Sequence, residues 1–133
     1  MEARWRTLIY TYIMGFLSNI FKSKEQKERE ALISQAENGD AEAAYQLFRE
    51  EYDNVSVSEA NAKWLRLGAE NGSSECQFFL GVYFQLTIKD YAKAFKWYKI
   101  AADNGNYSAQ NNVGIFYSHG IGIQKNIAEA IKY

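Results

Sequence analysis

The chain has 133 residues, of which 15 are basic and 16 are acidic, so its formal net charge is −1, and it contains no proline. This length is typical of one domain, and so balanced a charge provides no broad positive field to attract nucleic acid or an anionic membrane. The single cysteine, Cys76, excludes an internal disulfide and a cysteine-based zinc site. Because proline breaks helix interiors, its absence favours an uninterrupted stack of helices.

The first 21 residues have apolar side chains spaced by three and four, which predicts an amphipathic helix over residues 4–20. Fifteen uncharged residues lie between Arg6 and Lys22, whereas a membrane-spanning helix needs about 20. The sequence Ser18-Asn19-Ile20 is a poor cleavage site for a signal peptide. The residues that follow the apolar rhythm are Trp5, Leu8, Ile9, Tyr12, Ile13, Phe16, Leu17 and Ile20.

Three interpretations of this amphipathic helix, residues 1–23, stay open. In the first, its apolar stripe packs on the first repeat helices and caps the stack. In the second, residues 1–21 attach the protein to a membrane surface, and in the third the helix mediates self-association or partner docking. Met14 followed by Gly15 also fits a translation start, in which case residues 1–13 are not native. We expect a cytoplasmic protein, with a periplasmic or membrane-associated location as the alternative.

A period of 33 residues organises the rest of the chain. Gly39, Gly72 and Gly105 are 33 positions apart, and Trp64 and Trp97 keep the same distance. A fixed period of this size is typical of stacked repeat units. Each of these glycines follows an asparagine at the end of a helical pattern, and glycine adopts positive φ without a Cβ penalty. We therefore expect two helices to meet at each Asn-Gly.

The period predicts an array over residues 24–133 that consists of a half repeat, two complete repeats and an incomplete one. Their bounds are 24–38, 39–71, 72–104 and 105–133. Residues 22–30 alternate in charge, which favours a solvated linker or a helix start over a binding site. The helices that we expect in the array are 25–38, 41–52, 58–71, 74–86, 90–104, 107–118 and 126–133.

Small and aliphatic residues stand four and eight positions after each repeat glycine, which places both on one helical face. They are Ala43, Cys76 and Ala109, then Leu47, Leu80 and Val113. We therefore interpret Cys76 as a buried apolar filler. Gly81 and Gly114 lie inside helices, where glycine costs roughly 1 kcal/mol relative to alanine. We expect a neighbouring helix to pass too close for a Cβ at these two positions.

This combined pattern resembles the Sel-one-like repeat (SLR), a relative of the tetratricopeptide repeat. That repeat reads approximately A-x-x-x-L-G-x-x-Y, then a loop that is often G-x-G, then K-A-x-x-W-x-x-K-A-A-x-x-G. The best copy has Cys76, Leu80, Gly81, Phe84, Lys93-Ala94, Trp97, Ala101-Ala102 and Gly105, and the next has Ala109, Val113, Gly114, Tyr117, Gly120-Ile121-Gly122 and Ala130. The first copy departs from the pattern at Phe48 and Asn61. Over residues 30–133 the resemblance implies an all-α fold, a right-handed α-solenoid of stacked antiparallel helix pairs.

The sequence contains no arrangement typical of an enzyme. Gly120-Ile121-Gly122 lacks the preceding strand and the third glycine of a nucleotide-binding loop, and His119 beside it is expected to be an exposed loop residue. The carboxylates show no spacing that fixes a catalytic pair. No serine or cysteine triad, P-loop or HExxH pattern occurs. We therefore expect no catalysis, no metal site and no cofactor.

In such a solenoid the first helix of each repeat lines the concave side, a surface that usually binds an extended peptide or a partner helix. We expect the positions seven and eleven after each repeat glycine to face that side. Asparagine and glutamine can hold a peptide backbone through paired donors and acceptors, with Phe79 and Tyr83 as apolar anchors. Alternatively, these aromatic residues pack the repeats together. The candidate residues are Gln46, Glu50, Phe79, Tyr83, Asn112 and Phe116.

The resemblance implies a non-catalytic protein-interaction module, an adaptor or scaffold that binds a peptide or partner protein, in bacterial envelope, secretion or host-interaction systems or in eukaryotic quality control. One alternative is a relative of the cysteine-rich repeat β-lactamases, whose paired cysteines this chain lacks. Another is a scaffold tethered to a membrane through residues 1–21. The last repeat lacks the Lys-Ala-Ala-x-x-Gly ending, so the chain is a piece of a longer array or its open end binds another copy or a partner. We expect no nucleic-acid partner.

Overall fold

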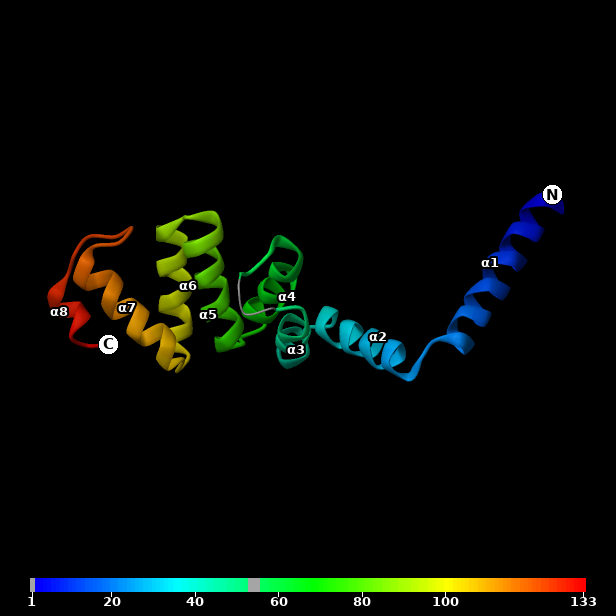
Figure 1. Ribbon diagram of the computed structural model, residues 1–133, viewed down its shortest axis with the longest axis horizontal. Helices are drawn as coiled ribbons and strands as arrows, with labels where there is room; N and C mark the ends of the chain where they lie inside the picture. Colours follow the sequence, from blue (N-terminus) through cyan, green and yellow to red (C-terminus); the bar gives the residue numbers. More distant parts are fainter. Residues whose placement is uncertain (1, 53–55) are drawn as a thin grey trace. The chain divides into compact units, whose positions relative to one another are not determined.

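The computed structural model describes residues 2–52 and 56–133 (Figure 1). The chain divides into two compact units, Met1–Ala31 and Leu32–Tyr133. Every regular element of the described residues is a helix, and these residues contain no strand. The elements are α1 (Glu2–Phe21), α2 (Lys24–Glu37), α3 (Ala41–Glu51), α4 (Glu59–Glu70), α5 (Ser74–Val82), η1 (Tyr83–Ile88), α6 (Tyr91–Asp103), α7 (Tyr107–His119) and α8 (Ile127–Ala130).

The first unit contains α1 and the first half of α2, and both predicted helices are confirmed to within two residues at each end. Reciprocal capping starts α2: the Gln26 N–H donates to Ser23 Oγ at 3.2 Å, and the Ser23 N–H donates to Gln26 Oε1 at 2.9 Å. Lys22 pairs with Glu30 at 2.6 Å across the turn. No residue of α1 is buried. Packing of its apolar stripe on the repeat helices stays a prediction.

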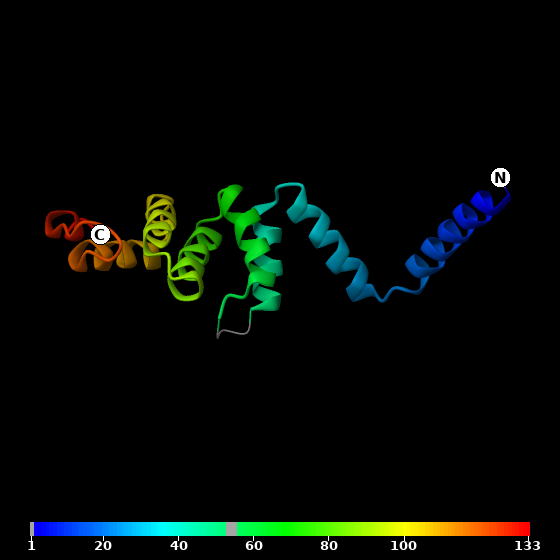
Figure 2. The same ribbon diagram turned by 90° about the horizontal axis from the view of Figure 1, so that it is seen from above.

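In the second unit, each α-helix from α3 onward packs on the next α-helix in the sequence. α3 contacts α4, α4 contacts α5, α5 contacts α6, α6 contacts α7, and α7 contacts α8. Figures 1 and 2 show this succession along the unit. Packing between nearest neighbours is the mark of a solenoid. The predicted all-α solenoid of stacked helix pairs is therefore confirmed.

The Asn-Gly turns between the helix pairs form as predicted. Gly39, Gly72 and Gly105 have φ values of 97°, 94° and 88°, which residues with a Cβ rarely adopt. At the first turn, the Asp40 N–H donates to the Gln35 carbonyl at 3.0 Å, a bond that closes a Schellman motif and satisfies a free carbonyl at the helix end. The glycine thus ends one helix in a way that lets the next begin two residues later.

The residue after each of these glycines caps the next helix. Asp40, Ser73 and Asn106 each have extended backbone, and each side chain accepts a hydrogen bond from a backbone N–H in the first turn of the following helix. Such caps satisfy donors that have no partner within the helix. In the second turn the capping residue is Ser73 and not the neighbouring Ser74.

The predicted helix 74–86 is confirmed, but its last turn has π winding and the helical segment continues two residues further. α5 ends at Val82, and the chain continues as the π-helical segment η1. The Lys89 N–H donates to the Phe84 carbonyl five residues earlier, which is the spacing of a π-helix. Lys89 has a φ of 61°, the one positive value among the described residues other than glycine. Apolar spacing over six residues does not distinguish α from π winding, because both keep the segment helical.

The predicted helix 126–133 is too long, since α8 ends at Ala130. Its last turn tightens, because the Lys132 N–H donates to the Glu129 carbonyl three residues earlier. Conversely, α7 extends to His119, so this exposed residue ends a helix and does not lie in a loop. Gly120 terminates α7 with a φ of 66°.

Close packing between helices is confirmed at one of the two predicted glycines. A Cβ on Gly81 would lie 2.6 Å from two carbons of the Tyr98 ring. At Gly114 the expectation is wrong, because the nearest atom to an added Cβ would be 3.4 Å away, an ordinary contact. Cys76 is fully buried, and a Cβ on Gly68 would lie 2.3 Å from its sulfur. Cys76 is therefore the predicted apolar filler.

Candidate partner-binding surface

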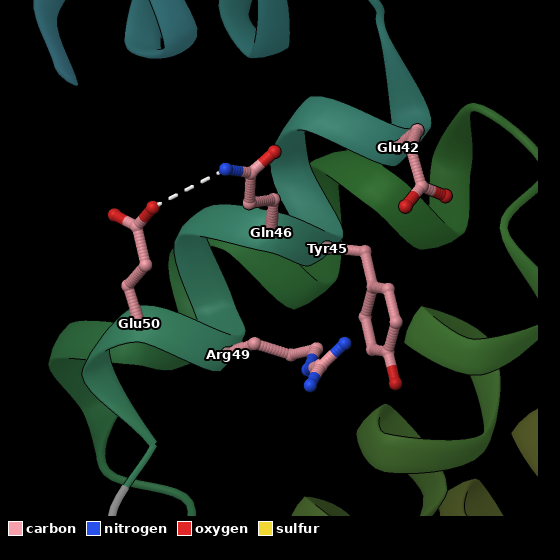
Figure 3. A pocket seen from close by; sticks show the side chains of 5 residues that line it. All are labelled: Glu42, Tyr45, Gln46, Arg49 and Glu50. Carbon is pink, nitrogen blue, oxygen red and sulfur yellow. Dashed lines mark hydrogen bonds between the residues drawn. The ribbon is translucent and has the colours of Figure 1, made fainter. Parts of the chain in front are cut away.

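One side of α3 opens onto a hollow of about 410 Å³ (Figure 3), here called the α3 hollow. Its lining residues are Glu42, Tyr45, Gln46, Arg49 and Glu50. These positions recur at intervals of three and four, so they share one face of the helix. The buried residues of α3 are Ala43, Ala44, Leu47 and Phe48. The spacing that buries the apolar face therefore also gathers five polar or amphipathic side chains on the other.

The side chains of the α3 hollow interact with one another. The Gln46 side-chain N–H donates to Glu50 Oε1 at 3.4 Å, drawn as the dashed line in Figure 3. Arg49 Cζ lies 5.9 Å from the centre of the Tyr45 ring, within the range of a cation–π contact. Burial raises the pKa of Tyr45, and the positive charge of Arg49 opposes that shift. The hollow thus contains an amide, a guanidinium, two carboxylates and one aromatic ring, and of these groups the guanidinium lies over the ring.

Phe79 on α5 lies next to this surface. The centre of its ring is 6.4 Å from that of Tyr45, 5.0 Å from that of Phe48 and 5.6 Å from that of Tyr52. Aromatic pairs at such distances add stability beyond the area they bury. Phe79 is half-buried, so it packs the first repeat on the second and supports the Tyr45 ring at the edge of the hollow.

The expected position of Tyr83 and Phe116 on an open surface is wrong. Tyr83 is 1 % exposed and Phe116 is 2 % exposed. The Phe116 ring lies 6.0 Å from Phe95 and 5.5 Å from Tyr98, both on α6. Each of the two buried residues follows a complete helix pair, and the second helix of that pair covers its side chain.

A hydrogen-bonded cluster shows how α4 covers Tyr83. The Tyr83 hydroxyl donates to the Glu59 carboxylate, which also accepts a hydrogen bond from Arg66 Nη1 at 3.0 Å. The bond from Tyr83, followed by that from Arg66, lowers the pKa of Glu59, and the Glu59 carboxylate raises the pKa of Tyr83. Asn112 is half-buried on α7. Burial raises the pKa of Tyr98, and a hydrogen bond with the Asn112 side chain opposes this shift, while the Tyr98 hydroxyl donates to Gln85 Oε1 at 2.7 Å.

The structure brings together two of the six predicted residues, Gln46 and Glu50, in the α3 hollow. It adds Glu42, Tyr45 and Arg49, which the sequence reasoning did not select. A signal for them was present, because Glu42 and Arg49 lie four and three residues from Gln46 and Tyr45 lies four residues from Arg49, all on the side of α3 away from its buried apolar residues. The positions seven and eleven after the repeat glycine include only two of the five residues on this helix face.

Comparison with known proteins places this fold in a family. A sequence model of the Sel1 repeat matches residues 74–106 and 108–133. The crystal structure of a Sel1 repeat protein from Oxalobacter formigenes is similar to this chain, with a TM-score of 0.69 and 30 % sequence identity over 80 % of this chain and 84 % of that chain. The chain belongs to the Sel1 repeat family.

A second Sel1-like structure agrees with this assignment. A protective antigen present in uropathogenic Escherichia coli strains, which displays an SLR fold, is similar with a TM-score of 0.68 and 32 % identity. The similarity covers 78 % of this chain and 24 % of that chain, so this chain spans about a quarter of the antigen. No curated protein sequence matches the chain.

The matched Sel1 repeats do not include the α3 hollow. The two matches cover α5 to α6 and α7 to α8, whereas the hollow lies on α3 in the preceding helix pair. That pair also contains Phe48 and Asn61, where the sequence departs from the repeat pattern. Proteins built from Sel1 repeats are generally protein-interaction modules. The hollow therefore lies on the part of the array whose sequence is least like the family consensus.

The Sel1 array shows no cluster that would bind a metal ion, since no three His, Cys, Asp or Glu side chains converge within residues 2–52 and 56–133. Burial raises the pKa of Cys76 to about 11, so its thiol is protonated at neutral pH. His119 Nδ1 lies 3.0 Å from the Ile115 carbonyl oxygen of the same helix turn. Ser118 Oγ lies 2.8 Å from the same ring nitrogen, a distance at which a base can activate a nucleophile, but the Ser118 hydroxyl donates to the Ile115 carbonyl at 2.9 Å.

Proposed function

We propose that this Sel1 repeat chain is a non-catalytic adaptor or scaffold that binds a segment of a partner protein in the α3 hollow. The observation that carries the proposal is the hollow, in which one face of a single helix leaves about 410 Å³ open. Tyrosine and arginine are enriched among the residues that dominate binding energy at protein interfaces, and the hollow has one of each. The general role of Sel1 repeats in protein interaction supports the same conclusion.

The chemistry of the hollow favours a polar partner segment that contains a basic residue. Glu42 and Glu50 provide two carboxylates against the one guanidinium of Arg49, so the lining has a net negative charge. The Gln46 amide both donates and accepts hydrogen bonds, as a peptide backbone requires. Its bond to Glu50 is 3.4 Å long, beyond the usual range of 2.7–3.2 Å, so a partner can replace it at little cost.

Apolar contact at this surface would come from Tyr45, whose ring lies against Phe79. Asn112 remains a proposed contact for a segment long enough to reach the third repeat. We do not extend the proposal to Tyr83 and Phe116, because a side chain that is 1 % or 2 % exposed cannot contact a partner without local unfolding.

Site-specific photo-crosslinking tests the proposal. A benzophenone amino acid at Gln46 of the full-length protein, expressed in cells of its source, should crosslink to a discrete protein partner. The same amino acid at Lys96, exposed on α6, should not. Glu42→Lys, which reverses one of the two carboxylates expected to attract the basic residue, should reduce recovery of that partner at least tenfold, and Glu70→Lys, the same substitution at an exposed residue of α4, should leave recovery unchanged. Equal recovery by the two variants would contradict the proposal.

The absence of catalysis is a separate prediction of this proposal. The purified protein should not turn over nitrocefin, because no reactive group among the described residues is positioned to attack a lactam ring. Turnover that is above the buffer rate and disappears in the Cys76→Ala variant would favour the β-lactamase alternative.

A further inference from the structure

α1 has a narrow polar stripe with a basic residue at each end. The stripe follows intervals of three and four, so its members lie above one another on one side of the helix. They are Arg4, Thr7, Thr11, Gly15, Ser18 and, just past the last turn, Lys22. Outside the stripe, the polar residues of α1 are Glu2, Arg6 and Asn19. At 3.6 residues per turn, apolar side chains occupy about two-thirds of the circumference.

The large apolar side chains of α1 are exposed to a degree unusual for a soluble surface. Trp5 is 64 % exposed, Tyr12 is 78 % and Phe21 is 81 %. The other exposed members of this surface are Leu8, Ile9, Tyr10, Ile13, Met14, Phe16, Leu17 and Ile20. Contiguous apolar surface on this scale marks a site of interaction with another protein or a membrane.

Two of the three hydroxyl groups of the stripe, those of Thr7 and Thr11, are hydrogen-bonded within the helix. Thr7 Oγ1 donates to the Ala3 carbonyl at 2.9 Å, and Thr11 Oγ1 donates to the Thr7 carbonyl at 2.8 Å. Because these groups have partners, placing them at an apolar boundary costs less than burying unpaired hydroxyls. Water or lipid head groups are therefore needed chiefly at Ser18 and at the two charged ends of the stripe.

The charge of this segment is opposite to that of the rest of the chain. Residues 2–24 contain four basic residues, Arg4, Arg6, Lys22 and Lys24, and one acidic residue, Glu2. The whole chain has a net charge of −1, so the remainder is acidic. Lys22 and Lys24 are paired with carboxylates of α2, whereas among the described residues no ion pair involves Arg4 or Arg6.

Within the described residues, no helix is both long and apolar enough to cross a membrane. We propose that α1 binds the surface of an anionic lipid bilayer, with its axis in the interface and the stripe from Arg4 to Lys22 toward water. Helices with a broad apolar face, basic residues and interfacial aromatic side chains bind in this way. Each Lys or Arg near an anionic surface adds to the attraction.

A bilayer fits α1 better than a second copy of the same helix. A helix pair buries a narrow seam at heptad positions, whereas the apolar surface of α1 is about two-thirds of its circumference. Parallel pairing would also bring Arg4 and Arg6 of two copies together at one end. This inference does not depend on the α3 hollow and can fail without affecting the proposed function of the repeat array.

Flotation of the full-length protein with vesicles tests the inference. Vesicles of phosphatidylcholine mixed with phosphatidylglycerol should carry the protein upward, with affinity at least tenfold above that for pure phosphatidylcholine vesicles. Arg4→Glu/Arg6→Glu should lower the affinity at least tenfold, because two positive charges become negative. The matched control, Lys96→Glu/Lys125→Glu on the repeat array, changes the net charge equally and should float like the unmodified protein.

An apolar variant separates a bilayer from a protein partner. Ile9→Asp/Ile13→Asp should abolish flotation while the circular dichroism of the repeat array stays unchanged, since no residue of α1 is buried. Equal flotation with neutral and anionic vesicles would overturn the inference. So would a dimer, seen by light scattering, that Ile9→Asp/Ile13→Asp dissociates in a protein that does not float.

Discussion

The first two complete repeats, 39–71 and 72–104, differ at one pair of aligned core positions. The first repeat has the larger side chain on its first helix, and the second repeat has it on its second helix. At positions 33 residues apart, the first repeat has Phe48 on α3 and Leu65 on α4, and the second has Gly81 on α5 and Tyr98 on α6. Leu65, Phe48 and Tyr98 are at most 1 % exposed, and Gly81 is also buried. The departure from the consensus glycine at Phe48 is therefore compensated by a smaller residue on the paired helix. The two repeats thus fill their cores with different residues at the aligned positions.

The junctions between repeats show the same exchange. Gly68 meets Cys76 where the first repeat packs on the second, and Ala101 and Ala109 occupy the aligned positions where the second packs on the third. All four residues are buried. Protein interiors are packed as densely as organic crystals, so an added atom on one side must be removed from the other. Substitutions that change one member of a pair should therefore be costly, and substitutions that change both should be less so.

The largest effect is expected from Phe48→Ala. Removing a fully buried aromatic ring that contacts Tyr52 and Phe79 at 5.0 Å leaves a cavity, and such substitutions cost about 3–5 kcal/mol. Urea unfolding followed by circular dichroism would measure this loss. Phe48→Ala/Leu65→Tyr, which moves the bulk to α4 as in the second repeat, should lose less. No recovery in the double variant would show that the two positions do not share one volume.

Gly81→Ala should be the next most costly substitution, at about 2 kcal/mol, in the range of overpacked cores. The new Cβ would lie 2.6 Å from two Tyr98 ring carbons. That ring cannot move away easily, because Phe78 and Phe116 lie 5.8 Å and 5.5 Å from it. Since alanine favours helix over glycine by roughly 1 kcal/mol, the clash must exceed this gain for the protein to be destabilised.

Gly114→Ala is the matched control for that comparison. It occupies the aligned position in the third repeat, where an added Cβ would come no closer than 3.4 Å to any neighbour. The higher helix propensity of alanine should therefore leave stability equal or raised by up to about 1 kcal/mol. If both alanine variants lost the same stability in urea unfolding, contact with Tyr98 could not be the cause.

These contrasts also show what the sequence can predict. The period of 33, the asparagine-glycine turns and the caps at Asp40, Ser73 and Asn106 act within a few residues of one helix end, so the pattern locates the helices to within two residues through α4. The winding of η1 and the short α8 depend on hydrogen bonds that apolar spacing does not encode. Local signals thus predict the elements, and tertiary context adjusts their ends.

The residues of the candidate surface were harder to predict, because the side chains seven and eleven positions after each repeat glycine have different neighbours in each repeat. Gln46 and Glu50 obey the rule and are exposed. Tyr83 and Phe116 obey it too, but each is covered by the second helix of the preceding pair. Side-chain partners such as Glu59 for Tyr83 lie 24 residues away in sequence, beyond the reach of any periodic argument about one helix.

A smaller effect should appear at the junction of Gly68 and Cys76. In Gly68→Ala the added Cβ would lie 2.3 Å from the Cys76 sulfur, which should cost about 1–2 kcal/mol. Gly68→Ala/Cys76→Ala reproduces the pair Ala101 and Ala109 of the next junction, so it should recover most of this loss. A double-mutant cycle from urea unfolding should give a coupling of about 1 kcal/mol or more, and additive losses would refute the volume exchange.

The smallest expected effect is the loss of stability that the Cys76 thiol causes at alkaline pH, which the alanine at the aligned position cannot cause. Burial raises the thiol pKa from its ordinary value of 9.0 to about 11, so the folded protein keeps a proton that the unfolded chain loses. Stability from this group is therefore fully present below pH 9 and decreases as the pH rises from 9 to 11. At pH 10 the loss should be about 1 kcal/mol. Cys76→Ala lacks this group and retains every other titratable group of the chain. The stability difference between the two proteins, measured by urea unfolding at pH 8 and pH 10, should therefore shift by that amount in favour of Cys76→Ala.

A constant stability difference between pH 8 and pH 10 would mean that the thiol is not desolvated in the folded protein. Rapid reaction of the native protein with Ellman's reagent at pH 8 would lead to the same conclusion.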